Sequence, residues 1–239
     1  MARGRRTSAR MAPRRWLVRA LALAALFGLA FAAWLWWDMR SWRPDETLYP
    51  EQGAVIASGA GPVRFETLRA LGGAFVYLTL PATGGAPDPG FPERLAAAQA
   101  AGLKVGVVQR FNPCLSADPQ SADFSRLVAR DADLLPPAIA LEGLADGCDP
   151  AVSDAAVESE LMTLINQIER HAGKSAILKL GRAFEARHRT ATALSRDLWL
   201  ARDRARPDYA GRPWLLWSAN SALVSDVSAE PIEWVVVQK

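Results

Sequence analysis

The chain has 239 residues, 50% of them hydrophobic, which is long enough for one folded core and too apolar for a disordered polyampholyte. Its formal net charge of +3 is unevenly spread: residues 1–43 hold nine arginines and one acid, a charge of +8, which leaves −5 for residues 44–239. Phosphate contacts need clustered lysines and arginines, so an acidic body excludes a nucleic-acid partner.

An uncharged apolar segment at residues 20–37 follows seven arginines. A helix of this length nearly spans a hydrocarbon core of about 30 Å. Flanking arginines keep the N-terminus cytoplasmic. We therefore predict a single-pass anchor in a bacterial-type inner membrane, with a cytoplasmic basic tail at residues 1–19 and a C-terminal domain that is periplasmic or extracellular.

A cleaved signal peptide is the alternative to an anchor, and Ala30-Phe31-Ala32 fits a small-residue cleavage site. The tryptophans at 34, 36 and 37 would then form an unusual mature terminus, whereas aromatic rings favour a membrane interface. The anchor is the preferred interpretation. Residues 38–50 are polar and predict a short linker, and residues 51–239 form the exported domain.

Short apolar runs alternate with longer helical stretches in this domain. Strands are expected at residues 54–57, 74–80, 104–108, 138–141, 175–180, 198–201, 214–218 and 232–237, and helices at 63–71, 91–101, 119–131 and 155–172. This rhythm is typical of parallel βαβ units. We predict an α/β fold, an irregular TIM-like β/α barrel, with a doubly wound open sheet as the alternative.

Residues that could ligate a metal are scarce. The two histidines are His171, expected to face the dipole at a helix C-terminus, and His188, expected to face water in a charged stretch. Neither a metal nor a cofactor is expected, because convergent ligands are missing from the sequence. Cys114 and Cys148 each follow a predicted strand, so a barrel places both on one rim. An oxidising compartment permits a disulfide between them, and two free thiols are the alternative.

Eight segments follow one another at characteristic spacing over about residues 50–239. They are GAVIASGAGPVRF from Gly53, FVYLTLPATGGAPDPGF from Phe75, AAAQAAGLKVGVV from Ala96, QSADF from Gln120, LPPAIALE from Leu135, AGKSAIL from Ala172, LWLAR from Leu198 and WLLW from Trp214. In this order they resemble the family 25 glycoside hydrolases, the lysozyme-like muramidases. The resemblance implies an irregular β/α barrel that cuts the glycan of peptidoglycan at N-acetylmuramic acid.

The resemblance also locates the acids of the catalytic centre. Family members typically carry Asp on strand one, where this chain has Val55, and Asp-x-Glu after the Pro-Pro strand, where it has Ala140 and then Glu142. A further family Asp near the C-terminus falls on Glu233. Glu142 is therefore the candidate general acid, Glu233 is a second candidate, and two acid positions are substituted.

Other positions at the barrel mouth depart from the family as well. Val108-Gln109 stands in the place of a family Tyr-His pair, and Trp217 precedes Ser218-Ala219, which stands in the place of a Gln-Tyr pair. Asp88 lies in an Asp-Pro segment that the family shares. We predict Asp88, Gln109 and Trp217 as candidate binding residues.

Glycoside cleavage needs an acid for the leaving oxygen and a second group for the oxocarbenium-like centre or for water. Val55 and Ala140 supply neither. We therefore predict a membrane-tethered, catalytically impaired domain that binds peptidoglycan glycan or another envelope partner. Two alternatives stay open: an active muramidase with Glu142 as general acid, aided by Glu233 or Asp88, and a structural membrane protein whose barrel mouth binds nothing.

Overall fold

The computed structural model describes residues 12–130 and 133–238, and the chain divides into two units, Met1–Ser41 and Trp42–Lys239. The first unit holds α1 (Ala12–Ser41), a helix of 30 residues. Most of the basic tail predicted at 1–19 lies outside the described residues. The helix continues through Ser41, so the first residues of the predicted linker at 38–50 are helical.

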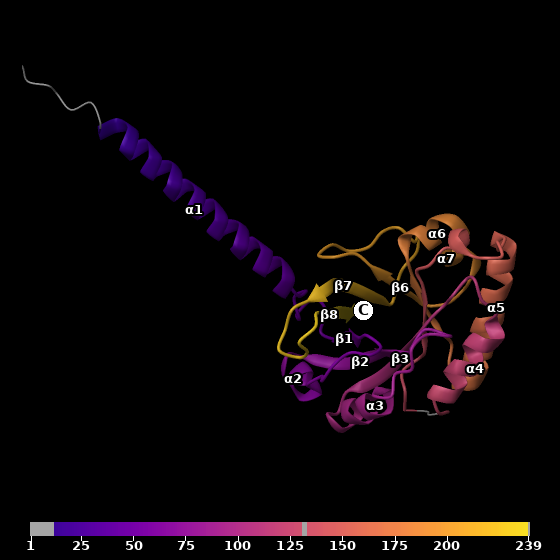
Figure 1. Ribbon diagram of the computed structural model, residues 1–239. Coiled ribbons are helices and arrows are strands. Elements are labelled where there is room, and N and C mark those ends of the chain that lie inside the picture. The colour runs from indigo at the N-terminus through magenta and orange to yellow at the C-terminus, as the bar shows by residue number, and fades with distance from the viewer. Residues whose placement is uncertain (1–11, 131–132, 239) are drawn as a thin grey trace, which may run out of the picture. The chain divides into compact units, whose positions relative to one another are not determined.

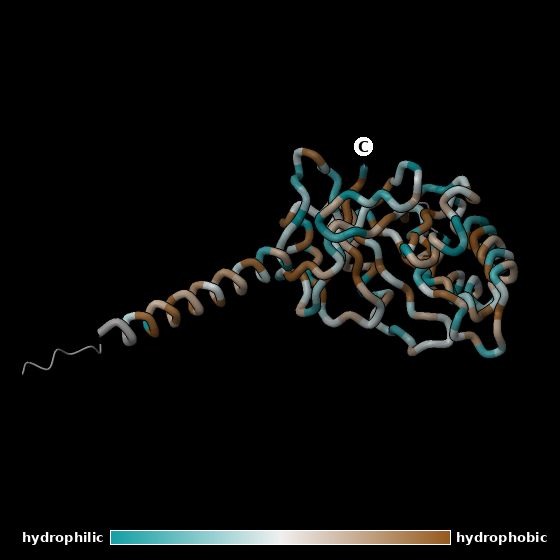
Figure 2. Tube along the Cα trace, turned by 90° about the horizontal axis from the view of Figure 1, so that it is seen from above, coloured by the Kyte–Doolittle hydropathy of each residue, from teal (hydrophilic) through white to brown (hydrophobic). Residues whose placement is uncertain are grey.

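Helix α1 is apolar over most of its length, as the hydrophobic colouring in Figure 2 shows. From Trp16 to Ser41 its length and composition are sufficient to cross a membrane, and none of its apolar window is buried against the protein. A signal sequence near an N-terminus has the same properties. The helix thus agrees with the predicted apolar segment at 20–37 without distinguishing an anchor from a signal peptide.

The second unit is a closed barrel (Figure 1). Its strands are β1 (Gln52–Ile56), β2 (Gly73–Thr79), β3 (Lys104–Arg110), β4 (Ala138–Leu141), β5 (Ile177–Leu180), β6 (Leu198–Ala201), β7 (Leu216–Leu223) and β8 (Ile232–Val237). Neighbours from β1 to β7 are parallel, whereas β8 is antiparallel to both β7 and β1. The predicted barrel is confirmed, and the pairing of β1 with β8 excludes the open sheet.

The helices of this unit lie outside the strands (Figure 1). They are α2 (Phe65–Ala70), α3 (Phe91–Ala100), α4 (Ala117–Leu127), α5 (Asp154–Ala172), α6 (Arg182–His188), α7 (Thr190–Ala193) and the 3-10 turn η1 (Ala145–Gly147). The long helix α5 begins at Ser153, whose hydroxyl accepts from the N–H of Ala156, and ends at Gly173, which has a positive φ of 66°. Both signals place its ends where the sequence predicts them.

The barrel interior alternates glycine with aromatic rings on adjacent strands. Gly53 pairs with Phe75, and Gly106 pairs with Tyr77. A Cβ on Gly106 would lie 2.3 Å from the ring of Tyr77, so this position requires glycine. Burial raises the pKa of Tyr77, whose hydroxyl donates to the carbonyl of Pro136 at 3.1 Å. The interior is therefore filled by side chains below the level of the mouth.

The expectation that His188 faces water is wrong. The segment after β5 forms helix α6, which the sequence pattern did not predict, and His188 is its last, buried residue. Its ring stacks on Phe184 with centroids 4.5 Å apart, and Nδ1 lies 3.2 Å from Glu158 on α5. The stretch was misassigned because three of the six other residues of α6 are charged, while few residues form the apolar face of this short helix.

Residues 42–50, predicted as part of the linker, pack against the barrel. The rings of Trp42 and Tyr49 lie 6.5 and 5.5 Å from the ring of Trp217, between centroids. Asn220 donates to the carbonyl of Trp42 at 2.9 Å, and Gln52 donates to that of Tyr49 at 2.8 Å. This segment belongs to the folded unit.

Asp88 joins two loops on the rim of the barrel. It accepts hydrogen bonds from the hydroxyl of Ser58 at 3.1 Å and the N–H of Gly59 at 2.8 Å, and it pairs with Arg94 on α3. Burial alone would raise the pKa of Asp88, but the Gly59 N–H, the Arg94 guanidinium and the Ser58 hydroxyl together hold that pKa below its ordinary value. The loop after β1 is thereby tied to the loop after β2.

Cys114 and Cys148 form a disulfide in the structure, with their Cα atoms 5.2 Å apart. The bond connects the loop between β3 and α4 to the loop between β4 and α5, next to η1. Both loops lie at the carboxyl ends of parallel strands. The crosslink therefore restrains the same rim that carries Glu142.

Replacing Asp88 by Asn should lower the free energy of unfolding by about 2 kcal/mol, since it leaves the half-sequestered Arg94 without a charge partner. The pKa of Asp88 in the folded protein lies below its ordinary value, so its carboxylate contributes its full stabilisation of the fold above about pH 4. That contribution is lost as the pH falls through the folded pKa. Urea unfolding of wild type and variant from pH 7 to pH 2.5 tests this, with Asp123→Asn at the exposed Arg126 pair as the matched control. If the difference in unfolding free energy between wild type and Asp88→Asn did not decrease as the pH falls, the stabilising role of the Asp88 carboxylate would be contradicted.

Replacing both cysteines by serine should cost about 3–4 kcal/mol of stability, since the disulfide closes a loop between residues 34 apart in sequence. Non-reducing mass spectrometry of the exported protein checks the bond, and urea unfolding with and without reductant checks its energy. The double variant should not respond to reductant. Two free thiols in the exported wild-type protein would overturn the prediction.

Candidate functional site

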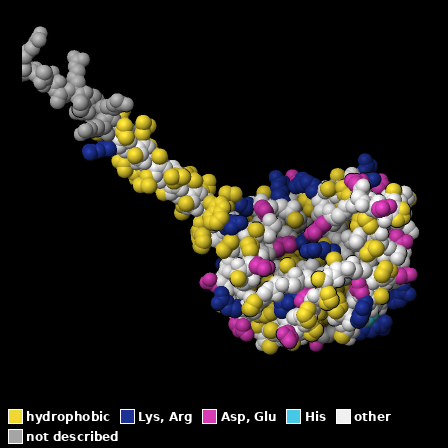
Figure 3. Space-filling model, in the orientation of Figure 1, with side chains coloured by type: hydrophobic (Ala, Val, Ile, Leu, Met, Phe, Trp, Pro, Cys, Tyr) yellow, Lys and Arg dark blue, Asp and Glu magenta, His cyan; other side chains and the backbone are white. Residues whose placement is uncertain are grey.

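A cavity of about 190 Å³ opens at the carboxyl ends of the parallel strands, which is the end where β/α barrels carry their sites. Because β8 runs antiparallel, its first residues reach the same end. Figure 3 shows a hollow there with basic and acidic side chains gathered inside it. The residues that line the cavity are Val55, Ala57, Thr79, Val108, Arg110, Ala140, Glu142, Lys179, Ser221, Pro231 and Glu233.

The structure brings together four of the predicted positions in this cavity. Val55 on β1 pairs directly with Glu233 on β8, while Ala140 on β4 lies two residues before Glu142. Val55 and Ala140 are buried, and both face the barrel interior. The two substituted acid positions are thus apolar walls of the same cavity that holds the two remaining carboxylates.

Lys179 on β5 connects the two carboxylates. Its Nζ lies 2.7 Å from Oε2 of Glu233 and 3.6 Å from Oε1 of Glu142. The Lys179 side chain is 11% exposed and that of Glu233 is 18% exposed, whereas that of Glu142 is 52% exposed. Lys179 and Glu233 therefore form a largely buried ion pair, and Glu142 lies on its solvent side.

The other oxygen of Glu233 is held by a short hydrogen-bond chain. The indole N–H of Trp199 donates to Oγ of Ser218 at 2.7 Å, and that hydroxyl donates to Oε1 of Glu233. Nζ of Lys179 lies 5.1 Å from the centre of the Trp199 ring, within the range of a cation–π contact. Both oxygens of Glu233 thus have hydrogen-bond partners. The indole of Trp199 contacts Ser218 through its N–H and Lys179 through its ring face.

Glycoside cleavage sets a geometric requirement with which the carboxylates of this cavity can be compared. A retaining or inverting mechanism uses one carboxylic acid and one carboxylate that is available to the sugar carbon or to water. Within the described part of the chain, the carboxylates lining the cavity are Glu142 and Glu233, and both contact Lys179.

The three predicted binding residues lie outside this cavity. Asp88 is buried at the rim, where it accepts hydrogen bonds from Ser58 and Gly59. Gln109 is buried on the outer face of β3, because side chains alternate along a strand and its neighbours Val108 and Arg110 face the cavity. Trp217 likewise points outward from β7 and donates its indole N–H to the carbonyl of Arg202 at 2.8 Å.

Sequence reasoning missed Lys179 and Arg110. Lys179 is the one charged residue in the otherwise apolar strand β5, and a buried lysine is rare unless it has a partner. A single charged residue within an apolar strand was therefore the signal by which Lys179 could have been found. Arg110 ends β3, where a charged residue reads as the ordinary polar end of a strand.

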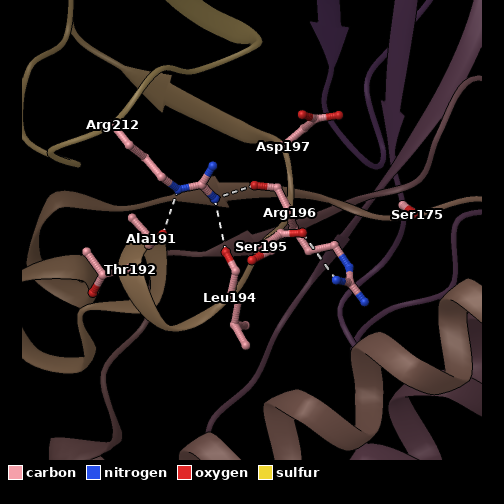
Figure 4. Close-up of a pocket in the computed structure, with 8 residues that line it drawn as sticks. All are labelled: Ser175, Ala191, Thr192, Leu194, Ser195, Arg196, Asp197 and Arg212. Atoms are coloured by element: carbon pink, nitrogen blue, oxygen red, sulfur yellow. Dashed lines mark hydrogen bonds between the residues drawn. The ribbon is translucent and has the colours of Figure 1, made fainter.

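A larger cavity of about 560 Å³ lies at the opposite end of the barrel, before β5 and β6 (Figure 4). Arg212 lines this cavity. It donates hydrogen bonds to the carbonyls of Ala191 at 2.6 Å and Leu194 at 3.0 Å, and to that of Arg196. Arg196 in turn pairs with Glu169 on α5. These arginines tie the loop before β6 to helices α7 and α5.

Across residues 12–130 and 133–238, no group of three or more His, Cys, Asp and Glu side chains is placed to hold a metal ion. The polar lining of the cavity combines Lys179 and its two carboxylate partners with Arg110, Thr79 and Ser221. Carboxylates can transfer protons, and such a set of side chains can recognise charged and polar groups.

Comparison with solved structures shows a common fold. A family 25 glycosyl hydrolase from Bacillus anthracis superposes with a TM-score of 0.73 at 22% identity, covering 84% of this chain and 93% of that one. A lysozyme from Streptomyces coelicolor gives 0.67 at 15% identity over 79% and 92% of the two chains. The spore cortex lytic enzyme SleM from Clostridium perfringens gives 0.67 at 18% identity over 82% and 69%. Comparison with curated protein sequences finds no match.

The model of the glycosyl hydrolases family 25 matches residues 56–223, from the end of β1 to the end of β7. This range covers most of the chain and contains Ala140, Glu142 and Lys179, whereas Val55 immediately precedes it. The protein therefore belongs to the glycosyl hydrolases family 25.

Proposed function

We propose that this protein is a membrane-tethered family 25 domain that acts at the cell wall by binding peptidoglycan glycan, or another envelope partner, with little or no hydrolysis. Family membership and the lysozymes and muramidases among its structural neighbours support peptidoglycan as the ligand. The observation that carries the proposal of impairment is the position of Lys179 between Glu142 and Glu233.

Three features of the cavity each remove part of the catalytic machinery. Val55 and Ala140 provide methyl groups where the resembling enzymes carry carboxylates. Glu233 is fully engaged by Lys179 and Ser218. General acid–base catalysis contributes about 10²–10⁴-fold to a rate, and groups that act as a unit fail together when one is lost. Glu142 alone can donate a proton but cannot also stabilise charge at the sugar carbon.

An active muramidase is the second candidate function, and one observation favours it. Glu142 is half exposed at the cavity edge and Glu233 lies across the same cavity, so two carboxylates do face a common space. In this alternative Glu142 is the general acid and Lys179 must move away from it during turnover. The two candidates differ in whether Glu142→Gln abolishes a measurable rate.

Tethering is supported by α1, whose apolar stretch follows the arginine-rich N-terminal sequence. The protein would then lie in a bacterial-type inner membrane with its N-terminus cytoplasmic and the barrel periplasmic or extracellular. The disulfide between Cys114 and Cys148 agrees with an oxidising compartment for the barrel.

Protease added to spheroplasts should digest or release the barrel while a cytoplasmic marker stays intact. Membrane fractionation should keep the full-length chain in the pellet after a carbonate wash, because α1 is long enough to span the bilayer. Protection of the barrel from protease would contradict the orientation. A soluble product that lacks the apolar segment would show a cleaved signal peptide instead.

The full-length protein in detergent micelles should hydrolyse purified peptidoglycan at least about 10³-fold more slowly than an active family 25 lysozyme. Release of reducing ends measures this, and pelleting with insoluble peptidoglycan measures binding in the same preparation. Val55→Asp with Ala140→Asp should raise turnover only if the groove admits glycan. Strong turnover by the unmodified chain, lost on Glu142→Gln but kept on the control Glu66→Gln at an exposed acid of α2, would establish the active alternative.

A further inference from the structure

Arg110, Ala140 and Lys179 lie at one level of the barrel on three consecutive strands. Arg110 on β3 pairs with Ala140 on β4, and Ala140 pairs with Lys179 on β5. Neighbouring strands are about 4.8 Å apart, so the methyl group of Ala140 lies between two cationic side chains. All three residues line the cavity at the mouth.

The two cations differ in how well they are satisfied. Lys179 has a close partner in Glu233 at 2.7 Å and a longer contact with Glu142 at 3.6 Å. The guanidinium of Arg110 is exposed, and among the residues that the structure describes it has neither an ion-pair nor a hydrogen-bond partner. The cavity thus holds an unpaired positive charge beside one that is shared with a half-exposed carboxylate.

We propose that the cavity binds a saccharide through a carboxylate that lies over Ala140 and pairs with Arg110 and Lys179. This inference rests on the proposed binding function and names the chemical class of its ligand. The ligand carboxylate takes the space that an aspartate at position 140 would fill, so a substituted acid position becomes a subsite for an acid from outside. Guanidinium and carboxylate groups match in geometry and form charge-assisted hydrogen bonds.

The size and the walls of the cavity suit an acidic substituent on a sugar. Its volume of about 190 Å³ is smaller than the 300–1,000 Å³ of typical small-molecule pockets, so it takes one substituent or one ring rather than an oligosaccharide. Val55, Val108 and Ala140 provide an apolar wall for the ring face, and Thr79 and Ser221 provide hydroxyl groups. The rest of a glycan strand would extend into solvent.

Glu142 is a competitor for Lys179 in this arrangement and not a ligand-binding group. Its side chain is 52% exposed, so it can turn toward solvent when a ligand carboxylate arrives. Neutralising Glu142 should then strengthen binding of an acidic sugar. This is the reverse of what a role as general acid predicts, because loss of such an acid lowers turnover and does not raise affinity for an acidic ligand.

Calorimetric titration of the full-length protein in detergent micelles tests the proposal with three disaccharides. One carries N-acetylmuramic acid with a free lactyl carboxylate, one carries a uronic acid, and one is the neutral dimer of N-acetylglucosamine. Wild type should bind an acidic disaccharide about tenfold more tightly than the neutral one. Preference for the lactyl acid identifies wall glycan as the source of the carboxylate, whereas preference for the uronate identifies an acidic envelope polysaccharide.

Four variants locate the effect. Arg110→Gln should remove the preference for acid without changing binding of the neutral disaccharide, and Glu142→Gln should raise acid affinity about threefold or more. Ala140→Asp should abolish acid binding by filling the subsite, with its folding checked by circular dichroism. Lys104→Gln is the matched control, because it removes an exposed positive charge from the opposite end of β3.

Equal binding of acidic and neutral disaccharides, or binding of none of the three, would overturn the inference. So would an effect of Lys104→Gln as large as that of Arg110→Gln, since general charge attraction would then explain the preference. These results differ from failure of the proposed function. Rapid hydrolysis of peptidoglycan would refute impairment, whereas the acid preference and its dependence on Arg110 are measured independently with the disaccharides.

Discussion

The ion pair between Lys179 and Glu233 is the interaction on which the mouth of this barrel depends. The two residues come from β5 and β8, which are not neighbours in the sheet, so the pair crosses the interior above the apolar layers. Removing one member of a buried pair typically costs about 3–5 kcal/mol, because the other charge stays buried without compensation. The serine and the indole beneath Glu233 fix its position further, and together they determine which charges are available to anything that enters the cavity.

The family 25 scaffold of this chain is maintained by features that lie away from this ion pair. Apolar strands, inward glycines opposite aromatic rings and clamped rim loops maintain the barrel, and none of these needs an acid at the mouth. Val55 and Ala140 extend the apolar interior by one level toward solvent. At the mouth Lys179 is paired with Glu233 and contacts Glu142, whereas Arg110 has no partner among the described residues. The proposed role in recognition would use such fixed charges to discriminate between ligands, whereas proton transfer requires a group that is free to change its charge.

Much of the fold could be predicted from the sequence because the barrel is built from strong local patterns. Strands such as β4 and β8 are apolar runs bounded by proline or polar residues, and α5 has a serine at its start and a glycine at its end. Two short helices after β5 escaped prediction, since a helix of a few residues carries too little periodic signal and its burial is decided by packing against α5. The positions of Glu142 and Glu233 came from the family resemblance, whereas their engagement by Lys179 depends on strand register across the barrel. Gln109 and Trp217 were placed at the mouth although strand alternation turns them outward, because alternation alone does not say which face is inside.

The segment from Trp42 to Pro50 sets where the autonomously folding part of the chain begins. Trp42 and Tyr49 cover the ring of Trp217, and Arg43 lies over the ring of Trp234 at 4.9 Å. A fragment that starts at residue 51 would expose both indoles to water and leave the side-chain amide of Gln52 without its carbonyl partners. We therefore expect a stable fragment of the barrel to need a start at or before Trp42, because these residues cover its outer aromatic surface.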